Sequence, residues 1–191
     1  MGYDKFIAEL EAQLEKTGCS IWRDLEFPPD WQVPILATRL EFNIIRVPVH
    51  MCVSYVSSPT GDDFVKLFEQ GLIFSKRAFS EPKDTSLLFS SYAIIPCLAC
   101  EVASPETIKF VTTYHPFLKE IFKYWDHGLI FYPVLYCLST NQVYSWSGYN
   151  FVGAAVWPYA RQLVKDSVEP TAAILAQSGK EPTTTKRPAG E

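Results

Sequence analysis

Near the start of the chain, apolar residues recur at helical spacing. Phe6, Leu10 and Leu14 follow one another every four residues, with charged residues between them. Residues four apart lie on the same face of a helix. The pattern therefore predicts an amphipathic helix that begins at Asp4 as the N-cap and ends at Gly18.

The next segment, residues 19–38, is rich in tryptophan and proline. Pro28 and Pro29 cannot donate a backbone hydrogen bond, which argues against regular structure, while the aromatic rings still need cover. We expect an ordered arm that wraps the core. From Glu41 to Val56, alternating apolar residues then predict one long strand or two, with a bend at Pro48.

Capping residues, glycines and prolines mark the elements that follow. The sequence predicts a short helix from Asp62 closed by Gly71, a strand from Tyr92 to about Val102, a helix that begins at Ser104-Pro105-Glu106 and breaks at Pro116, a helical piece from Phe117 to about Trp125, and a last helix from about Ala154 or Pro158 to Val168.

Between residues 127 and 160 the chain carries no Asp, Glu, Lys or Arg. Pro133 and a polar cluster interrupt this stretch well before the roughly 20 apolar residues that a membrane span needs. What remains is an apolar run over 131–138, a polar turn, and a second run over 143–146. This pattern predicts a β-hairpin.

Together these elements indicate one α/β domain, with mixed α+β as the alternative, in which helices pack on a single sheet. The element order is similar to that of the thioredoxin fold, with Tyr132-Pro133 near the position of that family's cis-proline. Where that family has its catalytic C-x-x-C, this chain has Ser57-Ser58-Pro59-Thr60-Gly61-Asp62. The resemblance therefore implies a fold without the redox chemistry.

The chain has 191 residues and a net charge of −4. This length suits one domain, which we place at residues 1–177, and residues 178–191 have too little apolar surface to order. Because the net charge repels phosphate and anionic lipid, we expect neither nucleic-acid nor membrane binding. The first residues show no leader sequence, so we expect a cytoplasmic protein.

Five cysteines are present, and Cys97 and Cys100 form a C-x-x-C motif. The motif lies in a predicted strand, where residues three apart point to opposite faces. We therefore expect reduced, structural cysteines, no metal and no cofactor. The alternative, a thiol-redox or zinc role for this pair, requires the strand to end at Pro96.

No nucleotide-binding, hydrolase or zinc-protease motif occurs in the chain, so no catalytic residue is assigned. Arg46 and His50 share one face of a predicted strand and could line a pocket. This leaves an enzyme or a small-molecule sensor with an aromatic pocket as one alternative function.

The leading hypothesis is a non-enzymatic interaction or assembly domain that binds a protein partner or a second copy of itself. Trp146, Tyr149 and Phe151 lie among Ser, Gly and Asn with no charge nearby. Tyr and Trp are enriched where partners bind, so we predict that this loop is the contact surface. The same aromatic residues also suit a core position, and that alternative stays open.

Overall fold

The computed structural model describes residues 2–27, 31–42, 46–78, 92–113, 129–148 and 157–178. Within these ranges the chain forms four helices and seven strands: α1 (Tyr3–Lys16), β1 (Ser20–Phe27), β2 (Trp31–Phe42), β3 (Arg46–Tyr55), α2 (Gly61–Ala78), β4 (Tyr92–Cys100), α3 (Pro105–Thr113), β5 (Leu129–Phe131), β6 (Val134–Cys137), β7 (Gln142–Ser145) and α4 (Trp157–Ser178).

The strands form one mixed sheet in the order β1-β2-β3-β4-β6-β7, with β5 also paired to β4. The first three strands are antiparallel neighbours, whereas β3, β4 and β6 run parallel. On β4, Ile94 pairs with Phe131 and Cys97 pairs with Val134, so β5 and β6 keep the same register. They act as one strand interrupted at Pro133, which has no N–H to donate.

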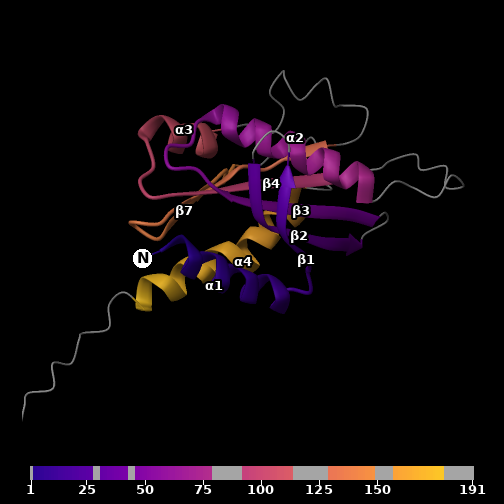
Figure 1. Cartoon of the computed structure of the whole chain (residues 1–191), viewed down its shortest axis with the longest axis horizontal. Helices are drawn as coiled ribbons and strands as arrows, with labels where there is room; N and C mark the ends of the chain where they lie inside the picture. Colours follow the sequence, from indigo (N-terminus) through magenta and orange to yellow (C-terminus); the bar gives the residue numbers. More distant parts are fainter. Residues whose placement is uncertain are drawn as a thin grey trace, which may run out of the picture.

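Helices cover both faces of the sheet: α1 and α4 lie on one side, and α2 and α3 lie on the other (Figure 1). Strand alternation divides the core accordingly. Met51, Ile95 and Tyr136 face α1 and α4. Ile94 and Leu135 face α2 and α3. The predicted class, a mixed α/β protein with helices packed on a sheet, is confirmed, whereas a thioredoxin-like order is not shown.

The predicted N-terminal helix is confirmed as α1, with Phe6, Leu10 and Leu14 buried. Its start differs from the prediction. Gly2 occupies the N-cap position, and no side chain caps the helix. Asp4 lies instead in the first turn, where its negative charge interacts favourably with the positive end of the helix dipole.

The prediction of an irregular arm over 19–38 is wrong, because this segment supplies β1 and the larger part of β2. Pro34 is tolerated because the pairing of β1 with β2 has a gap at its position. Arg23 pairs with Ile35 and Leu25 pairs with Val33, so Pro34 and Asp24 are left unpaired between them. Asp24 has a left-handed φ of 52°. The distortion removes the need for an N–H at the proline.

Residues 41–56 do not form a single element. Glu41 and Phe42 complete β2, and β3 begins at Arg46. Pro48 lies inside β3, paired with Leu40, and does not end the strand. Of the two predicted alternatives, one strand or two, the structure has two strands, but the division between them does not lie at Pro48.

Gly71 does not close the second helix, because α2 continues to Ala78. The glycine is required by packing: a Cβ at this position would lie 2.8 Å from Cys52 Sγ and 2.9 Å from Ile94 Cγ2. The last helix is also longer than predicted and reaches Ser178, with Pro170 inside it.

Several predictions from local signals are confirmed. Ser104 caps α3, since its Oγ accepts the Thr107 N–H at 3.1 Å. The hairpin forms as β6 and β7, and β6 is buried along its length between β4 and β7. The predicted break at Pro116, the helical piece 117–125 and, apart from Ser178 at the end of α4, the predicted tail 178–191 lie outside the described residues.

Candidate functional site

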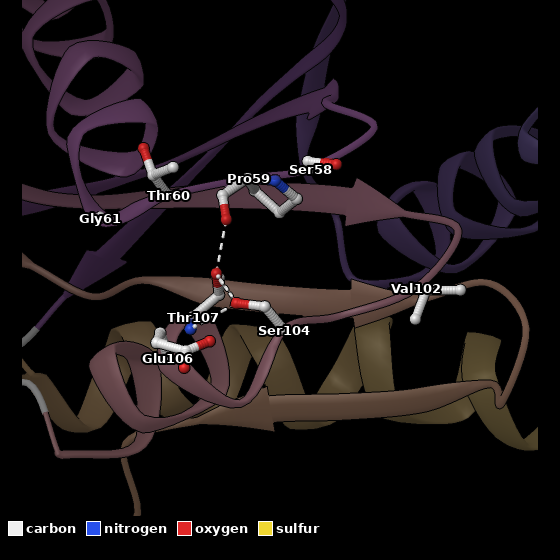
Figure 2. A pocket seen from close by; sticks show the side chains of 8 residues that line it. All are labelled: Ser58, Pro59, Thr60, Gly61, Val102, Ser104, Glu106 and Thr107. Atoms are coloured by element: carbon white, nitrogen blue, oxygen red, sulfur yellow. Dashed lines mark hydrogen bonds between the residues drawn. The ribbon is translucent and has the colours of Figure 1, made fainter.

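A pocket of about 300 Å³ opens at the carboxyl ends of the parallel strands β3 and β4. Its walls are the loop that leads from β3 into α2 and the loop that leads from β4 into α3 (Figure 2). We call it the carboxyl-edge pocket. It is lined by Ser58, Pro59, Thr60, Gly61, Val102, Ser104, Glu106 and Thr107.

The first wall is shaped by the start of α2. Asp63, in the first turn, accepts hydrogen bonds from both the N–H and the hydroxyl of Thr60, each at 2.8 Å. Both bonds run from Thr60 to one carboxylate oxygen of Asp63, an arrangement that resembles half of a capping box and holds the loop against the helix. Gly61 follows, and a Cβ there would lie 3.0 Å from the Phe110 ring of α3. Glycine thus allows the two helices to approach.

The second wall is tied to the first by a hydroxyl. Thr107, buried in the first turn of α3, donates its hydroxyl hydrogen bond to Pro59 O at 2.5 Å, and Figure 2 shows this bond spanning the two loops. Ser104 Oγ lies 2.9 Å from the Thr107 hydroxyl and accepts the Thr107 N–H. The two walls are therefore joined by a bond between residues 48 positions apart in sequence.

Carboxylates dominate the charge around this edge. Asp62, Glu101 and Glu106 are exposed, and none of the ion pairs among the described residues involves them. Asp62 and Glu106 occupy the first turns of α2 and α3 and complement the positive ends of the helix dipoles. The pocket therefore favours a cationic or neutral group over an anion.

Few of the lining residues carry a group that could react with a substrate. Thr107 and Ser104 are engaged in bonds that hold the fold, and Glu106 is the ionisable side chain among the lining residues. Nucleophilic catalysis needs a nucleophile beside a base that a third group orients. No group of three metal-ligating side chains occurs in the described part of the chain. The arrangement suits binding.

The aromatic loop predicted as a contact surface begins in the core. Trp146 keeps an exposed fraction of only 7% and packs edge-on against Trp157, with ring centroids 5.7 Å apart. Its carbonyl accepts the Tyr132 hydroxyl at 2.8 Å. Trp146 therefore takes the core position that the sequence leaves open as the alternative, while Tyr149 and Phe151 lie outside the described residues.

His50 is fully buried on the face of β3 that packs under α2. Its Nδ1 lies 2.8 Å from the Thr38 hydroxyl, and its ring meets Phe74 edge-on. Burial lowers the pKa of His50 to about 4. Arg46 begins β3, and its side chain is not among those described. The structure therefore places His50 in the core and does not bring it to the pocket.

Cys97 and Cys100 lie on opposite faces of the sheet, as strand alternation predicts. All five cysteines are free thiols. Cys100 instead pairs in register with Cys137 of β6. Spacing could not reveal this pair, because the two positions are 37 residues apart; the signal that exists is that each cysteine lies at or next to the end of an apolar run.

Sequence reasoning also missed the carboxyl-edge pocket, although it recognised both of its parts. The turn at 57–61 and the cap at Ser104 are local signals. Only the parallel pairing of β3 with β4 brings the two loops together.

Comparison of the chain with protein-family models, with curated proteins and with solved structures finds no match. None of the described helices has the length and apolar character needed to cross a membrane. The residues themselves are therefore the guide to function.

Proposed function

We propose that the protein is a non-enzymatic interaction domain that holds a basic, apolar segment of a partner protein at the carboxyl-edge pocket. One observation carries the proposal: the pocket is bordered by Val102, which is 66% exposed, and by Glu106, whose carboxylate forms no ion pair among the described residues. An apolar side chain that covers Val102 gains about 25 cal/mol for each Å² removed from water. A lysine or arginine beside it would meet Glu106 and Asp62.

A protein segment suits this site better than a free small molecule. The cavity of about 300 Å³ lies at the lower end of the range for small-molecule sites. A chain that places one side chain in the pocket can extend over the two loops that form its walls. We expect the partner to be cytoplasmic, as the sequence predicts for this protein.

This proposal keeps the class of function that the sequence predicts, an interaction domain. It places the partner contact at the carboxyl-edge pocket and not at the loop that begins at Trp146. Trp146 packs against Trp157 and cannot present its ring to a partner without leaving the core. The alternative of an aromatic pocket beside His50 loses support, because the His50 side chain is fully buried.

The test uses two short amidated peptides and the labelled full-length chain, followed by NMR. One peptide has a central leucine flanked by lysines, and its partner has glutamates in place of the lysines. We expect the basic peptide to shift the amide signals of the residues other than proline in 58–61 and 103–107 in a saturable way. The acidic peptide should leave them unchanged, because it meets Asp62 and Glu106 with like charge.

Three variants locate the contact. Val102→Ser and Glu106→Gln should each weaken binding of the basic peptide several-fold, since each removes one of the two proposed contacts. Ile174→Ser is the matched control, because Ile174 is an exposed apolar residue on α4, across the sheet from α3. Absence of peptide binding, or equal weakening by the control variant, would contradict the proposal.

A further inference from the structure

Two cysteines lie side by side at the end of the sheet. Cys100 is the last residue of β4, Cys137 is the last residue of β6, and the two are direct register partners. The pairing is well formed, since Leu138 N donates to Cys100 O at 2.8 Å. Neighbouring strands lie about 4.8 Å apart. This spacing falls within the Cα separations of about 4.4–6.8 Å found in disulfides.

Both side chains lie on the same face. Cys100 packs in the core under α2 and α3 together with Leu98 and Leu135, which are also register partners. Cys137 follows Leu135 by two residues and therefore points the same way. Cys97 faces α1 and α4. The structure thus brings together Cys100 and Cys137 and separates the two cysteines of the C-x-x-C motif.

The two thiols differ in their surroundings. Burial opposes ionisation of Cys137, but hydrogen bonds from Ser139, Thr140 and the backbone at Ala103 and Thr140 outweigh it and lower its pKa. Its Sγ lies 3.4 Å from both Glu101 O and Ser139 Oγ. For Cys100, burial and then the charge of Cys137 raise the pKa to about 11. The Cys137 thiol therefore ionises more readily than the Cys100 thiol.

The two thiols also differ in their exposure to solvent. Cys137 keeps an exposed fraction of 3%, whereas Cys100 is fully buried. A peroxide is little larger than water and can approach Cys137 at the end of the sheet. Of the two thiols, the more exposed Cys137 therefore meets the peroxide first. A thiolate that reacts first and a neighbouring thiol that resolves the product are the two parts of a redox-responsive pair.

We propose that Cys100 and Cys137 form a redox pair that hydrogen peroxide oxidises reversibly to a disulfide. The Cys137 thiolate attacks one peroxide oxygen, so that an S–O bond forms, the O–O bond breaks, and hydroxide leaves and takes up a proton. Cys100 Sγ then attacks the sulfenic sulfur of Cys137. The S–S bond forms as the S–O bond breaks, and the hydroxyl leaves with the Cys100 proton as water. Two thiols and one peroxide thus give one disulfide and two waters.

The position of the two cysteines on neighbouring strands also favours reduction of the disulfide. Side chains of direct strand neighbours stand about one strand spacing apart, which exceeds the Cβ separation of about 3.8 Å in relaxed disulfides. The strands must therefore move together to form the bond, and a strained disulfide is reduced more readily. A dithiol reductant should restore both thiols. This inference is independent of the proposed partner.

The test treats the full-length protein with hydrogen peroxide, blocks the remaining thiols by alkylation and maps disulfides by mass spectrometry. We expect a Cys100–Cys137 link that dithiothreitol reverses, formed at exposures that leave Cys52 and Cys97 reduced. Fragmentation after Leu98 distinguishes Cys97 from Cys100. A Cys97–Cys100 link would overturn the proposal. So would oxidation of Cys137 that is no faster than that of Cys52, or the absence of any link.

Two serine variants on the same strand provide the comparison. Cys100→Ser removes the resolving thiol, so Cys137 should accumulate as a sulfenic acid that dimedone traps. Cys97→Ser changes the opposite face of β4 and should leave the Cys100–Cys137 link intact. If dimedone labels Cys137 equally in the unmodified protein and in Cys100→Ser, Cys100 does not resolve the intermediate, and the pair is not a redox unit.

Discussion

The ring of Phe6 stacks on the ring of Tyr136, with centroids 4.1 Å apart and planes 11° from parallel. Both side chains are fully buried. The contact joins the first helix to β6, the strand between β4 and β7. It shows that α1 belongs to the core and packs directly on the sheet.

Replacing Phe6 with alanine should destabilise the protein by about 3–5 kcal/mol, because it removes a buried ring and leaves a cavity against Tyr136. Phe6→Leu should cost less, since it keeps much of the volume. Ile7→Ala is a suitable control, as Ile7 is only partly buried at the edge of the same core. Urea unfolding measures all three. Equal, small losses for both positions would mean that α1 does not pack as described.

Gly71→Ala should destabilise the protein by about 1 kcal/mol. Alanine gains about 1 kcal/mol in helix propensity, but its Cβ overpacks against Cys52 and Ile94, which costs typically about 1–3 kcal/mol. Because Cys52→Ala removes one of the two close atoms, the double variant should lose less than the sum of the single variants. A gain in melting temperature for Gly71→Ala would contradict this packing.

Stability should decline as pH falls from about 6.5 to about 4. His50 is neutral in the fold because burial lowers its pKa to about 4, whereas in the unfolded chain the pKa is near 6.5. Above pH 6.5 the side chain is neutral in both states. Below it the unfolded state binds a proton that the fold excludes, at a cost on the order of 3 kcal/mol by pH 4.

The comparison is His50→Gln, which keeps a polar atom for Thr38 and cannot ionise. Urea unfolding across this pH range should show a shallower decline for the variant than for the unmodified protein. Carboxylates contribute to acid unfolding in both proteins, so the difference between the two curves reports His50. Parallel curves would show that His50 does not stay neutral in the fold.

Ser75→Ala should leave the protein as stable as before or stabilise it by about 1 kcal/mol. The Ser75 hydroxyl is fully buried on α2 and has no hydrogen-bond partner among the described residues. Its removal relieves an unsatisfied polar group and improves helix propensity. Ser167→Ala is the matched control, because the buried Ser167 hydroxyl donates to Leu163 O at 2.6 Å. Thermal unfolding should favour Ser75→Ala over Ser167→Ala; the reverse order would refute the assignment.

The sequence alone determined the features that depend on neighbouring residues. The four-residue spacing of Phe6, Leu10 and Leu14 identified α1, and Ser104 identified the start of α3, because helix faces and caps are formed within a few residues. The apolar runs around a polar turn identified the hairpin of β6 and β7 for the same reason. Strand alternation also separated Cys97 from Cys100 correctly.

Tertiary structure decided what depends on contacts between distant segments. Prolines argued against strands over 19–38, yet pairing with β3 stabilises β2 and a local distortion accommodates Pro34. Gly71 looked like a helix stop because its packing against Cys52 and Ile94 cannot be seen in the sequence. The pocket and the Cys100–Cys137 pair exist only because parallel strands end at the same edge of the sheet. Side chains far apart along the chain meet there through strand register, which local patterns do not encode.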